Sequence, residues 1–336
     1  MLSATDLVGM SSEKRSGIAV FGSVLVDKIN VLEKFPSEGQ LTKISELEVA
    51  LGGLVPNVAI DLKRISKDLP VIAGGRVGAD SEGELVKKTL MDEGVDISAL
   101  ITDPDCPTSF TQVMSVKGGQ RTFFTFAGAS ARYGFEDIDF DSLNAEILHL
   151  GYFLLLDKVD SGDGERILRE AKKRGITTSI DLVSENSDRY KNVTNCLPYV
   201  DYLIINEYEA GMLTGIEPDN KSLEIIAKRL MEMGVRLGVV IHKPDVSVIL
   251  TERGFSHLAS YELPEGYIKG TTGAGDAFCA GALYGIAMGY TDTEILEFAS
   301  SCAAVSLASQ GATAAMRSYD EIKKICKKFG RKTICL

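Results

Sequence analysis

From Gly17 onward, short runs rich in β-branched residues alternate with segments of helical periodicity. Runs such as "IAVFGSVLVD" and "LGVVI" are strand-like, whereas "PNVAIDLKRISK" and "SLEIIAKRLMEMG" repeat their apolar residues with the period of a helix. This alternation is typical of a parallel sheet covered by helices. We therefore predict a single α/β domain over residues 17–330, with a mostly parallel central sheet and helices on both faces, after a polar tail at residues 1–16.

Two segments depart from this alternation. Residues 41–53 and 108–126 have strand-like patterns without intervening helices, and Gly118-Gly119 is a plausible hairpin turn within the second segment. We predict that these strands form a small antiparallel sheet, a lid that covers a site. The alternative is an ordinary extension of the edge of the main sheet.

Composition limits the classes of partner. The formal net charge of −11, from 36 basic and 47 acidic residues, disfavours nucleic-acid and anionic-membrane binding, and leaves a small molecule as the expected partner. No apolar run reaches the roughly 20 residues of a membrane span, and the first residues lack an apolar signal core, so we expect a cytoplasmic protein. The 6 cysteines form no Cys-x-x-Cys pair and are expected to be reduced.

One segment combines glycines with a single carboxylate. In "IKGTTGAGDAFCAGALYGIAMG", Ala277 to Ala287 are apolar almost all round, which predicts a buried helix that begins at the Gly273-Ala274-Gly275 turn. The first N–H groups of a helix have no partner within it, and glycines allow a ligand to approach them. The turn is therefore predicted to bind a phosphate or an oxyanion.

Asp276 directly follows this turn, where its charge would repel a bound anion. In phosphoryl transfer a carboxylate in such a position has a task, because it accepts the proton of the attacking hydroxyl. The alternative is an ordinary acidic residue in the first turn of a helix, where the helix dipole favours it. The segment is not a Walker loop, because the lysine of GxxxxGK[ST] is missing.

At this point the sequence resembles a family. "GTTGAGDAF" resembles the C-terminal signature of the ribokinase-like, or PfkB, carbohydrate kinases, and "FGSVLVD", "GGLVPNVA" and "INEYEAGMLTG" resemble earlier elements of the same family, as does "GGRVGADSEGELVKKTLMDEGVD". The resemblance extends from Gly17 to Lys328. It implies a ribokinase-like fold and an ATP-dependent kinase that uses Mg²⁺ to phosphorylate a primary hydroxyl of a small sugar or sugar-like polyol.

The resemblance also implies roles for the glycine-rich turn. Asp276 would be the base that takes the proton of the sugar hydroxyl. The backbone at Gly273, Ala274 and Gly275 would form the anion hole for the transferred phosphoryl group.

A second group of residues would bind the acceptor. Asp27, which we expect at the end of the first strand, would hold sugar hydroxyls, and Gly52 and Gly53 would let the sugar lie against the backbone. Asn57 offers donors and acceptors suited to a polyol, and Arg121 could reach the substrate from the lid. The alternatives are a solvated acid at Asp27, a helix-start residue at Asn57 and a solvated arginine on the lid.

The nucleotide side follows in the same way. By resemblance, Asn206 and Glu209 organise the magnesium and phosphate region, with Glu209 acting on the metal through water, and His242 and Thr272 adjoin the nucleotide. An acidic helix start is the alternative reading for Glu209. We predict strand-end positions for His149 and His242, neither of which has a partner spaced for a metal site or a triad.

The sequence also departs from the family pattern. Family members that bind a monovalent cation usually have an aspartate where this chain has Gly270, so activation by potassium is doubtful. Pro244 lies where the family has a nucleotide loop with two glycines, which predicts a loop of different shape. Leu25 and Leu54 replace an asparagine and a lysine that ribokinases often have, which argues against ribose as the sugar.

Two other functions stay open from the sequence. One is a nucleoside kinase of the same superfamily, and the other is a non-catalytic sugar sensor that kept the fold. Retention of the whole "GAGD" element argues against the sensor. Exposed edges of the lid strands predict a homodimer formed through the lid.

Overall fold

A large twisted sheet organises the computed structural model, which describes residues 15–116, 121–185 and 187–334. Within these residues the sheet has nine strands in the order β13-β12-β11-β10-β9-β8-β1-β4-β5, parallel from β11 to β5 and antiparallel at β12 and β13. Its strands are β1 (Ile18–Gly22), β4 (Val71–Gly78), β5 (Asp96–Asp103), β8 (Ile147–Phe153), β9 (Thr177–Leu182), β10 (Tyr202–Asn206), β11 (Gly238–His242), β12 (Val246–Thr251) and β13 (Gly254–Ala259).

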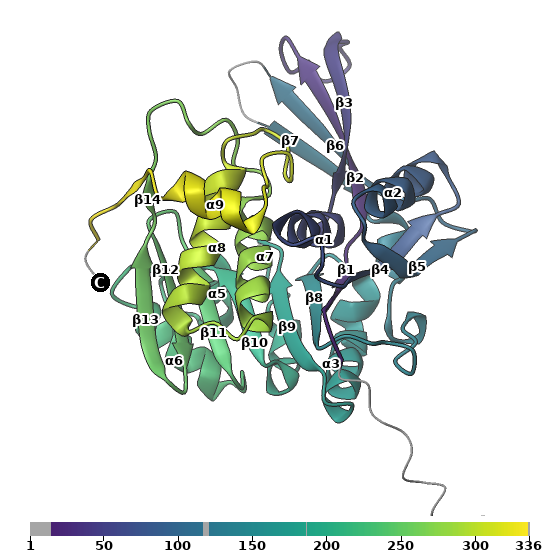
Figure 1. Ribbon diagram of the computed structural model, residues 1–336. Coiled ribbons are helices and arrows are strands. Elements are labelled where there is room, and N and C mark those ends of the chain that lie inside the picture. Colours follow the sequence, from purple (N-terminus) through teal and green to yellow (C-terminus); the bar gives the residue numbers. More distant parts are fainter. Residues whose placement is uncertain (1–14, 117–120, 186, 335–336) are drawn as a thin grey trace, which may run out of the picture.

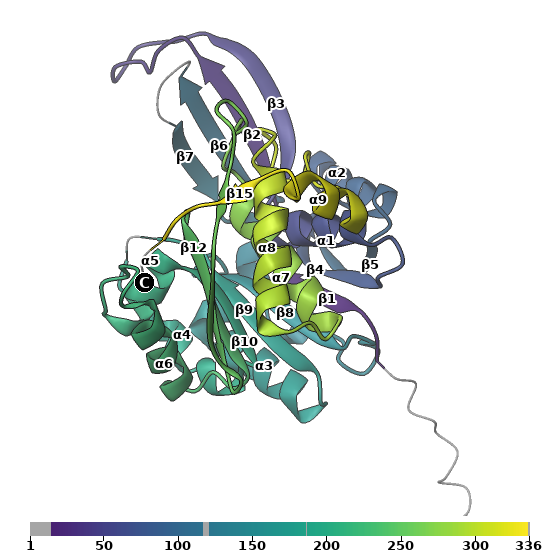
Figure 2. The same cartoon turned by 60° about the vertical axis from the view of Figure 1, so that its left-hand side comes forward.

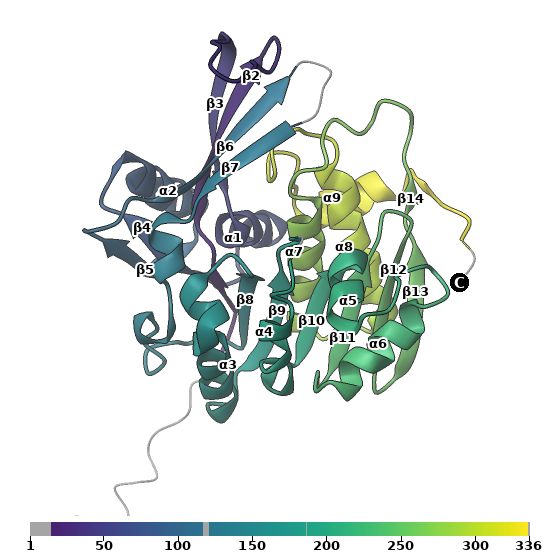
Figure 3. The ribbon, with the colours of Figure 1, turned by 180° about the vertical axis from the view of Figure 1, so that it is seen from behind.

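Helices cover both faces of this sheet, as predicted. One face carries α1 (Leu54–Ile65), α2 (Ser81–Asp92), α7 (Ala274–Ala287), α8 (Asp292–Ser306) and α9 (Tyr319–Cys326), in front of the sheet in Figure 1. The other face carries α3 (Gly164–Lys173), α4 (Lys191–Thr194), α5 (Glu207–Thr214) and α6 (Leu223–Glu232), which Figure 3 shows from behind.

The alternation of side chains along β1 explains why there are two cores. Ile18 and Val20 belong to the core that includes residues of α1, α7 and α8, whereas Ala19 and Phe21 belong to the core that includes residues of α3 and α6. A strand buried on both faces reads as a continuous apolar run, and this is the pattern seen in the sequence.

Short elements complete the main body. They are three 3₁₀ turns (Gly128–Arg132, Phe135–Asp137 and Leu197–Tyr199), one π turn (Val159–Asp163), and a two-stranded ribbon of β14 (Tyr261–Glu262) and β15 (Gly330–Arg331) within the residues that the structure describes. No helix in the described part of the chain is long and apolar enough to cross a membrane.

A second, four-stranded sheet projects beyond the main sheet as a lid (Figure 2). Its order is β3-β2-β6-β7, formed by β2 (Leu25–Leu32), β3 (Ile44–Gly52), β6 (Ser109–Val116) and β7 (Arg121–Phe126). The prediction of lid strands within 41–53 and 108–126 is confirmed, whereas the turn expected at Gly118-Gly119 falls outside the described residues. The lid is mixed rather than wholly antiparallel, because β2 and β6 run parallel.

The first strand was predicted wrongly. "IAVFGSVLVD" is two strands, because β1 ends at Gly22 and β2 begins at Leu25 in the lid. Gly22 has φ of 137° and lies against the carbonyl oxygen of Gly151, so a side chain there would collide with β8. Asp27 is therefore a lid residue, paired with Ala50 of β3, and does not end a strand of the main sheet.

Candidate active site

Asp276 lies in the first turn of α7, which begins at Ala274 as predicted. Gly273 caps the helix with φ of 78°, a left-handed conformation that glycine adopts without strain. The Asp276 side chain is buried. Because a helix gives its first N–H groups no internal acceptor, the start of α7 presents partial positive charge beside this carboxylate.

Two side chains from other elements hold the Asp276 carboxylate. The amide of Asn57, on α1, donates to Oδ2 at 2.8 Å. The hydroxyl of Tyr152, on β8, donates to Oδ1 at 3.1 Å and to Oδ2 at 3.4 Å. Asn57 thus bonds to a partner far away in the chain, and the alternative that it satisfies its own turn is not what the structure shows.

The pKa of Asp276 is raised to about 7, chiefly by burial and also by the nearby Asp181 carboxylate, while the hydrogen bonds from Asn57 and Tyr152 oppose the rise. A carboxylate with a pKa near neutrality can both accept and release a proton at neutral pH.

Gly275 and Gly273 have different surroundings although only one residue separates them. A Cβ on Gly275 would meet only the ring of His242, at 3.7 Å, which is ordinary contact. A Cβ on Gly273 would lie 2.6 Å from the Cβ of Ala312. Packing and backbone conformation therefore require glycine at Gly273, whereas Gly275 leaves open space next to a cavity.

The lid brings Asp27 and Gly52 to the same region. A Cβ on Gly52 would lie 2.5 Å from Oδ2 of Asp27, so the carboxylate rests against the bare backbone of Gly52. Burial, together with the charge of Asp276, raises the pKa of Asp27 to about 6. Gly53, with φ of 83°, is the residue that precedes α1, and the Ser23 carbonyl leaves no room for a side chain there.

Asn206 and Glu209 join the end of β10 to the start of α5. The Asn206 side chain accepts from the Glu209 N–H, and Oε2 of Glu209 accepts from the Asn206 N–H at 3.0 Å, which is a reciprocal helix cap. Oε1 of Glu209 accepts from Ser184 and from the Asn206 amide, each at 2.8 Å. Burial raises the pKa of Glu209 to about 8.

A cavity of about 280 Å³ connects these groups. Asp276, Gly275, Asn206, Glu209 and His242 all contribute to its wall. The residues at the start of α7 and those at the start of α5, which are far apart in the sequence, therefore face one space.

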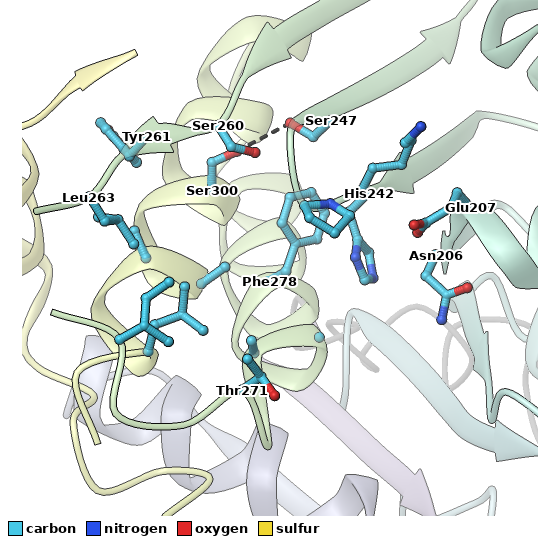
Figure 4. Close-up of a pocket in the computed structure, with 18 of the residues that line it drawn as sticks. Asn206, Glu207, His242, Ser247, Ser260, Tyr261, Leu263, Thr271, Phe278 and Ser300 are labelled. Atoms are coloured by element: carbon cyan, nitrogen blue, oxygen red, sulfur yellow. Dashed lines mark hydrogen bonds between the residues drawn. The ribbon is translucent and has the colours of Figure 1, made fainter. Parts of the chain in front are cut away.

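Gly275 also lines a larger cavity of about 790 Å³, which Figure 4 shows. The His242 ring lies against Phe278 with centroids 4.8 Å apart. Burial lowers the pKa of His242 to about 4, so the ring is a neutral aromatic surface at neutral pH. Thr271 lines this cavity, whereas Thr272 is exposed next to it.

One comparison establishes the family to which this chain belongs. Residues 15–318 match the pfkB family carbohydrate kinases. The match covers most of the chain and includes both the lid and α7. The chain belongs to the PfkB family of carbohydrate kinases.

Similar proteins cover nearly the whole of this PfkB kinase. It is 27% identical over 289 residues to a 5-dehydro-2-deoxygluconokinase of Clostridium perfringens, covering 83% of this chain and 84% of the relative. It is 24% identical over 313 residues to a ribokinase of Arabidopsis thaliana, with 92% and 81% covered. The solved structure of A. thaliana ribokinase with ribose and ATP shares its fold, with a TM-score of 0.81, 24% identity, and 93% and 99% covered.

At Gly270, where family members that bind a monovalent cation usually have an aspartate, the packing of this PfkB kinase leaves no room for a side chain. A Cβ on Gly270 would lie 2.9 Å from the Cα of Gln310 and 3.0 Å from the Ser309 carbonyl oxygen. The neighbouring Lys269 is exposed. The backbone of Ser309 and Gln310 therefore occupies the space that a side chain at Gly270 would need.

Two further sequence predictions have specific outcomes in this kinase. Arg121 begins β7 and pairs with Ser115, but its side chain lies outside the described part of the chain, so its contact with a substrate stays a prediction. His149 does not end a strand, because it lies in the middle of β8 and is fully buried. His242 does end β11.

Sequence reasoning missed Tyr152 and Asp181. Asp181 lies on β9, and its Oδ1 accepts from the Tyr152 N–H at 2.7 Å. Burial raises the pKa of Asp181 well above its usual value. The run "SIDLV" did offer a signal, because an acidic residue inside a buried strand is rare unless it is paired or functional.

Proposed function

We propose that this protein is an ATP-dependent kinase that phosphorylates a primary hydroxyl of a small sugar or sugar-like polyol. The observation that carries this proposal is the arrangement of Asp276 at the start of α7. Its carboxylate is held by Asn57 and Tyr152 and adjoins the cavity that Asn206 and Glu209 line. The PfkB membership supports a carbohydrate acceptor.

Asp276 is the base of this proposed reaction. A sugar hydroxyl that hydrogen-bonds to its carboxylate would pass its proton to Asp276 as the hydroxyl oxygen bonds to the γ-phosphorus. The pKa of about 7 suits this exchange at neutral pH. The hydrogen bonds from Asn57 and Tyr152 fix the carboxylate, so little reorganisation is needed during transfer.

The N–H groups at the start of α7 stabilise the transferred phosphoryl group. They are already oriented before the charge develops, which makes such donors effective. Gly275 supports this role, because it lines both cavities and a Cβ there would meet only the His242 ring.

The 790 Å³ cavity is the proposed ATP site. Its volume suits a nucleotide, and the neutral ring of His242 with Phe278 offers an apolar surface for a base. Lys332 and Pro244 both line this cavity, and the ammonium of Lys332 donates to the Pro244 carbonyl at 2.9 Å.

Magnesium fits the oxygen donors next to this cavity. Both oxygens of Glu209 already accept hydrogen bonds from the chain, so Glu209 would hold Mg²⁺ through water rather than as a direct ligand. When bound with ATP, the ion would neutralise charge on the phosphates. Its positive charge would also favour the ionised form of Glu209, which burial disfavours.

The acceptor pocket is proposed between the lid and α1. Asp27 faces this region from β2 with its carboxylate against the bare backbone of Gly52, and its pKa is raised to about 6. The names of the relatives indicate three acceptors to test. They are ribose, fructose and the sugar acid that a 5-dehydro-2-deoxygluconokinase phosphorylates.

A second copy of the chain is the proposed partner of the lid. Exposed apolar side chains lie on its two outer strands, β3 and β7: Leu47, Val49, Phe123, Phe124 and Phe126. Burying them against a second lid would remove this apolar surface from water. Sedimentation velocity should show a dimer that Leu47→Asp weakens, and a monomeric wild-type protein would contradict the pairing.

The test of the function is ADP release over a panel of sugars, sugar acids and nucleosides. Asp276→Asn should lower kcat by roughly 10²–10⁴-fold while sugar binding is kept within a few-fold. Asp61→Asn is the matched control, because Asp61 is also a fully buried acid on the helix that packs against α7. Turnover of nucleosides alone would indicate a nucleoside kinase, and binding of a sugar without any turnover would indicate a sensor.

A further inference from the structure

Three side chains with metal-binding atoms meet behind Asp276 without a part in the proposed reaction. They are His149 on β8, Asp181 on β9 and Cys279 on α7, and all three are buried. One ligand atom from each lies within 4.8 Å of the other two. Cys279 is one helical turn from Asp276, so this cluster lies directly beneath the proposed base.

The separations within the cluster fit a tetrahedral metal. Sγ of Cys279 lies 3.5 Å from Nε2 of His149, and Oδ2 of Asp181 lies 3.9 Å from the same nitrogen. Zinc bonds at tetrahedral angles would separate a ligand sulfur from a ligand nitrogen by about 3.5 Å. Only the carboxylate has to move inward for all three atoms to reach one ion.

Each of two ligands is oriented by a hydrogen bond on its far side. Nδ1 of His149 lies 3.1 Å from Oγ of Ser179, and Oδ1 of Asp181 accepts from the Tyr152 N–H at 2.7 Å. These bonds leave Nε2 and Oδ2 directed toward each other. In protein metal sites the ligands are usually held in place by such hydrogen bonds from residues that do not bind the metal themselves.

The cluster also has a route of entry and a free side. Asp181, Cys279 and Asp276 line the same 280 Å³ cavity, through which an ion and a water molecule could arrive. Three protein ligands and one open position are typical of zinc sites that keep an exchangeable ligand.

We propose that His149, Asp181 and Cys279 form a binding site for one thiophilic divalent cation, of the Zn²⁺ class. On binding, Cys279 and Asp181 act as thiolate and carboxylate, so any proton that either group carries passes to solvent, and the sulfur bonds to the metal. The ion lies one helical turn from Asp276, where its charge makes that carboxylate a weaker base. The site therefore inhibits phosphoryl transfer, a consequence that rests on the proposed function, whereas binding itself does not.

Cobalt tests the binding without any assay of activity. Titration of the full-length protein with Co²⁺ should give a sulfur-to-cobalt charge-transfer band and the strong d–d absorption of tetrahedral cobalt. Cys279→Ser should remove the charge-transfer band, and Ser179→Ala should weaken binding about tenfold. Cys302→Ser is the control, because Cys302 is a buried cysteine outside the cluster.

Either of two outcomes would overturn the site. One is a wild-type protein without a charge-transfer band, and the other is a band of equal strength in Cys279→Ser. If Cys279→Ser proves unfolded by circular dichroism, His149→Gln and Ser179→Ala decide the question through the same titration.

Zinc then tests the inhibition. At saturating Mg²⁺ and ATP, Zn²⁺ should inhibit the wild-type kinase, a chelator should reverse the effect, and Cys279→Ser should need at least about tenfold more Zn²⁺. Equal sensitivity of both proteins would show that zinc acts elsewhere. If the protein has no kinase activity at all, the proposed function fails, and the cobalt result still decides whether the metal site exists.

Discussion

The hydroxyl of Tyr152 donates to the carboxylate of Asp276, although the backbone of Tyr152 has φ of 60°. Few residues other than glycine adopt this conformation, and it is kept only where surrounding contacts hold it. Here the Tyr152 N–H bonds to Asp181 while the ring reaches α7. The pairing of β8 with β9 is irregular between Leu150 and Phe153, which is where Tyr152 leaves the regular strand.

Removal of the Tyr152 hydroxyl should shift the pH dependence of the reaction. This hydrogen bond lowers the pKa of Asp276, so Tyr152→Phe raises it. The base must be ionised, and the rising limb of kcat/KM against pH should therefore move to higher pH. Tyr133→Phe is the control, because the buried Tyr133 hydroxyl has no partner within the described residues. Superimposable pH profiles for wild type and Tyr152→Phe would contradict this role.

Alanine at Gly275 should lower the reaction rate, whereas alanine at Gly273 should lower thermal stability. Gly275→Ala adds a methyl group that meets only the His242 ring, so thermal stability should stay close to wild type while kcat falls strongly. Gly273→Ala should lower the melting temperature, because its φ is 78° and Ala312 lies against it. Thermal melts and steady-state kinetics on both variants make the comparison. A large loss of stability in Gly275→Ala would mean that the residue serves packing.

Asp27→Asn should weaken acceptor binding selectively. Hydrogen bonds to a charged group are worth about 1.5–3 kcal/mol, so KM for the sugar should rise roughly tenfold or more while KM for ATP changes little. Glu48→Gln, an exposed acid on the lid, should leave both constants unchanged. Asn57→Ala should in addition lower kcat, because Asn57 bonds to Asp276. Unchanged sugar KM in Asp27→Asn would remove Asp27 from the pocket.

Potassium should have little effect on the rate. Gly270 supplies no carboxylate, and Gln310 and Ser309 leave no room for one. A cation near the anion hole would then depend on backbone carbonyls alone, which compensate its charge poorly. The test replaces K⁺ by a bulky organic cation at fixed ionic strength, since screening alone alters nucleotide binding. Saturable activation by K⁺ would show that other oxygen atoms complete a cation site.

Asp61 should make stability depend on pH. Its side chain is fully buried on α1, neither oxygen has a hydrogen-bond partner within the described residues, and burial raises its pKa well above the usual value. The folded state thus keeps a proton that the unfolded state loses above its ordinary pKa, and this contribution to stability is lost as pH rises.

Asp61→Asn removes this dependence, because an amide does not titrate. The melting temperature of Asp61→Asn minus that of the wild type should therefore be larger at about pH 8 than at about pH 5. Parallel melting curves for the two proteins over this range would show that Asp61 is not protonated in the fold.

Periodicity in the sequence was enough for the α/β architecture and for the lid strands β3, β6 and β7, but not for β2. Apolar runs without alternation require strands buried on both faces, and a glycine turn before an apolar helix requires a helix start at Ala274. Local pattern did not reveal that "IAVFGSVLVD" divides at Gly22. That break depends on the close approach of Gly151 on a neighbouring strand, which is a contact between residues far apart in the chain.

The sequence by itself determined that Asp276 follows an anion-binding turn, because both belong to one continuous segment whose backbone geometry is local. Only the tertiary structure decided what surrounds the carboxylate. Asn57, Tyr152 and Asp181 come from three different elements, and their meeting depends on how α1, β8 and β9 pack around α7. The pKa of Asp276 depends on burial and on charges from these elements, and the cluster at Cys279 depends on how the same elements pack. Neither can be predicted from the spacing of residues along the sequence.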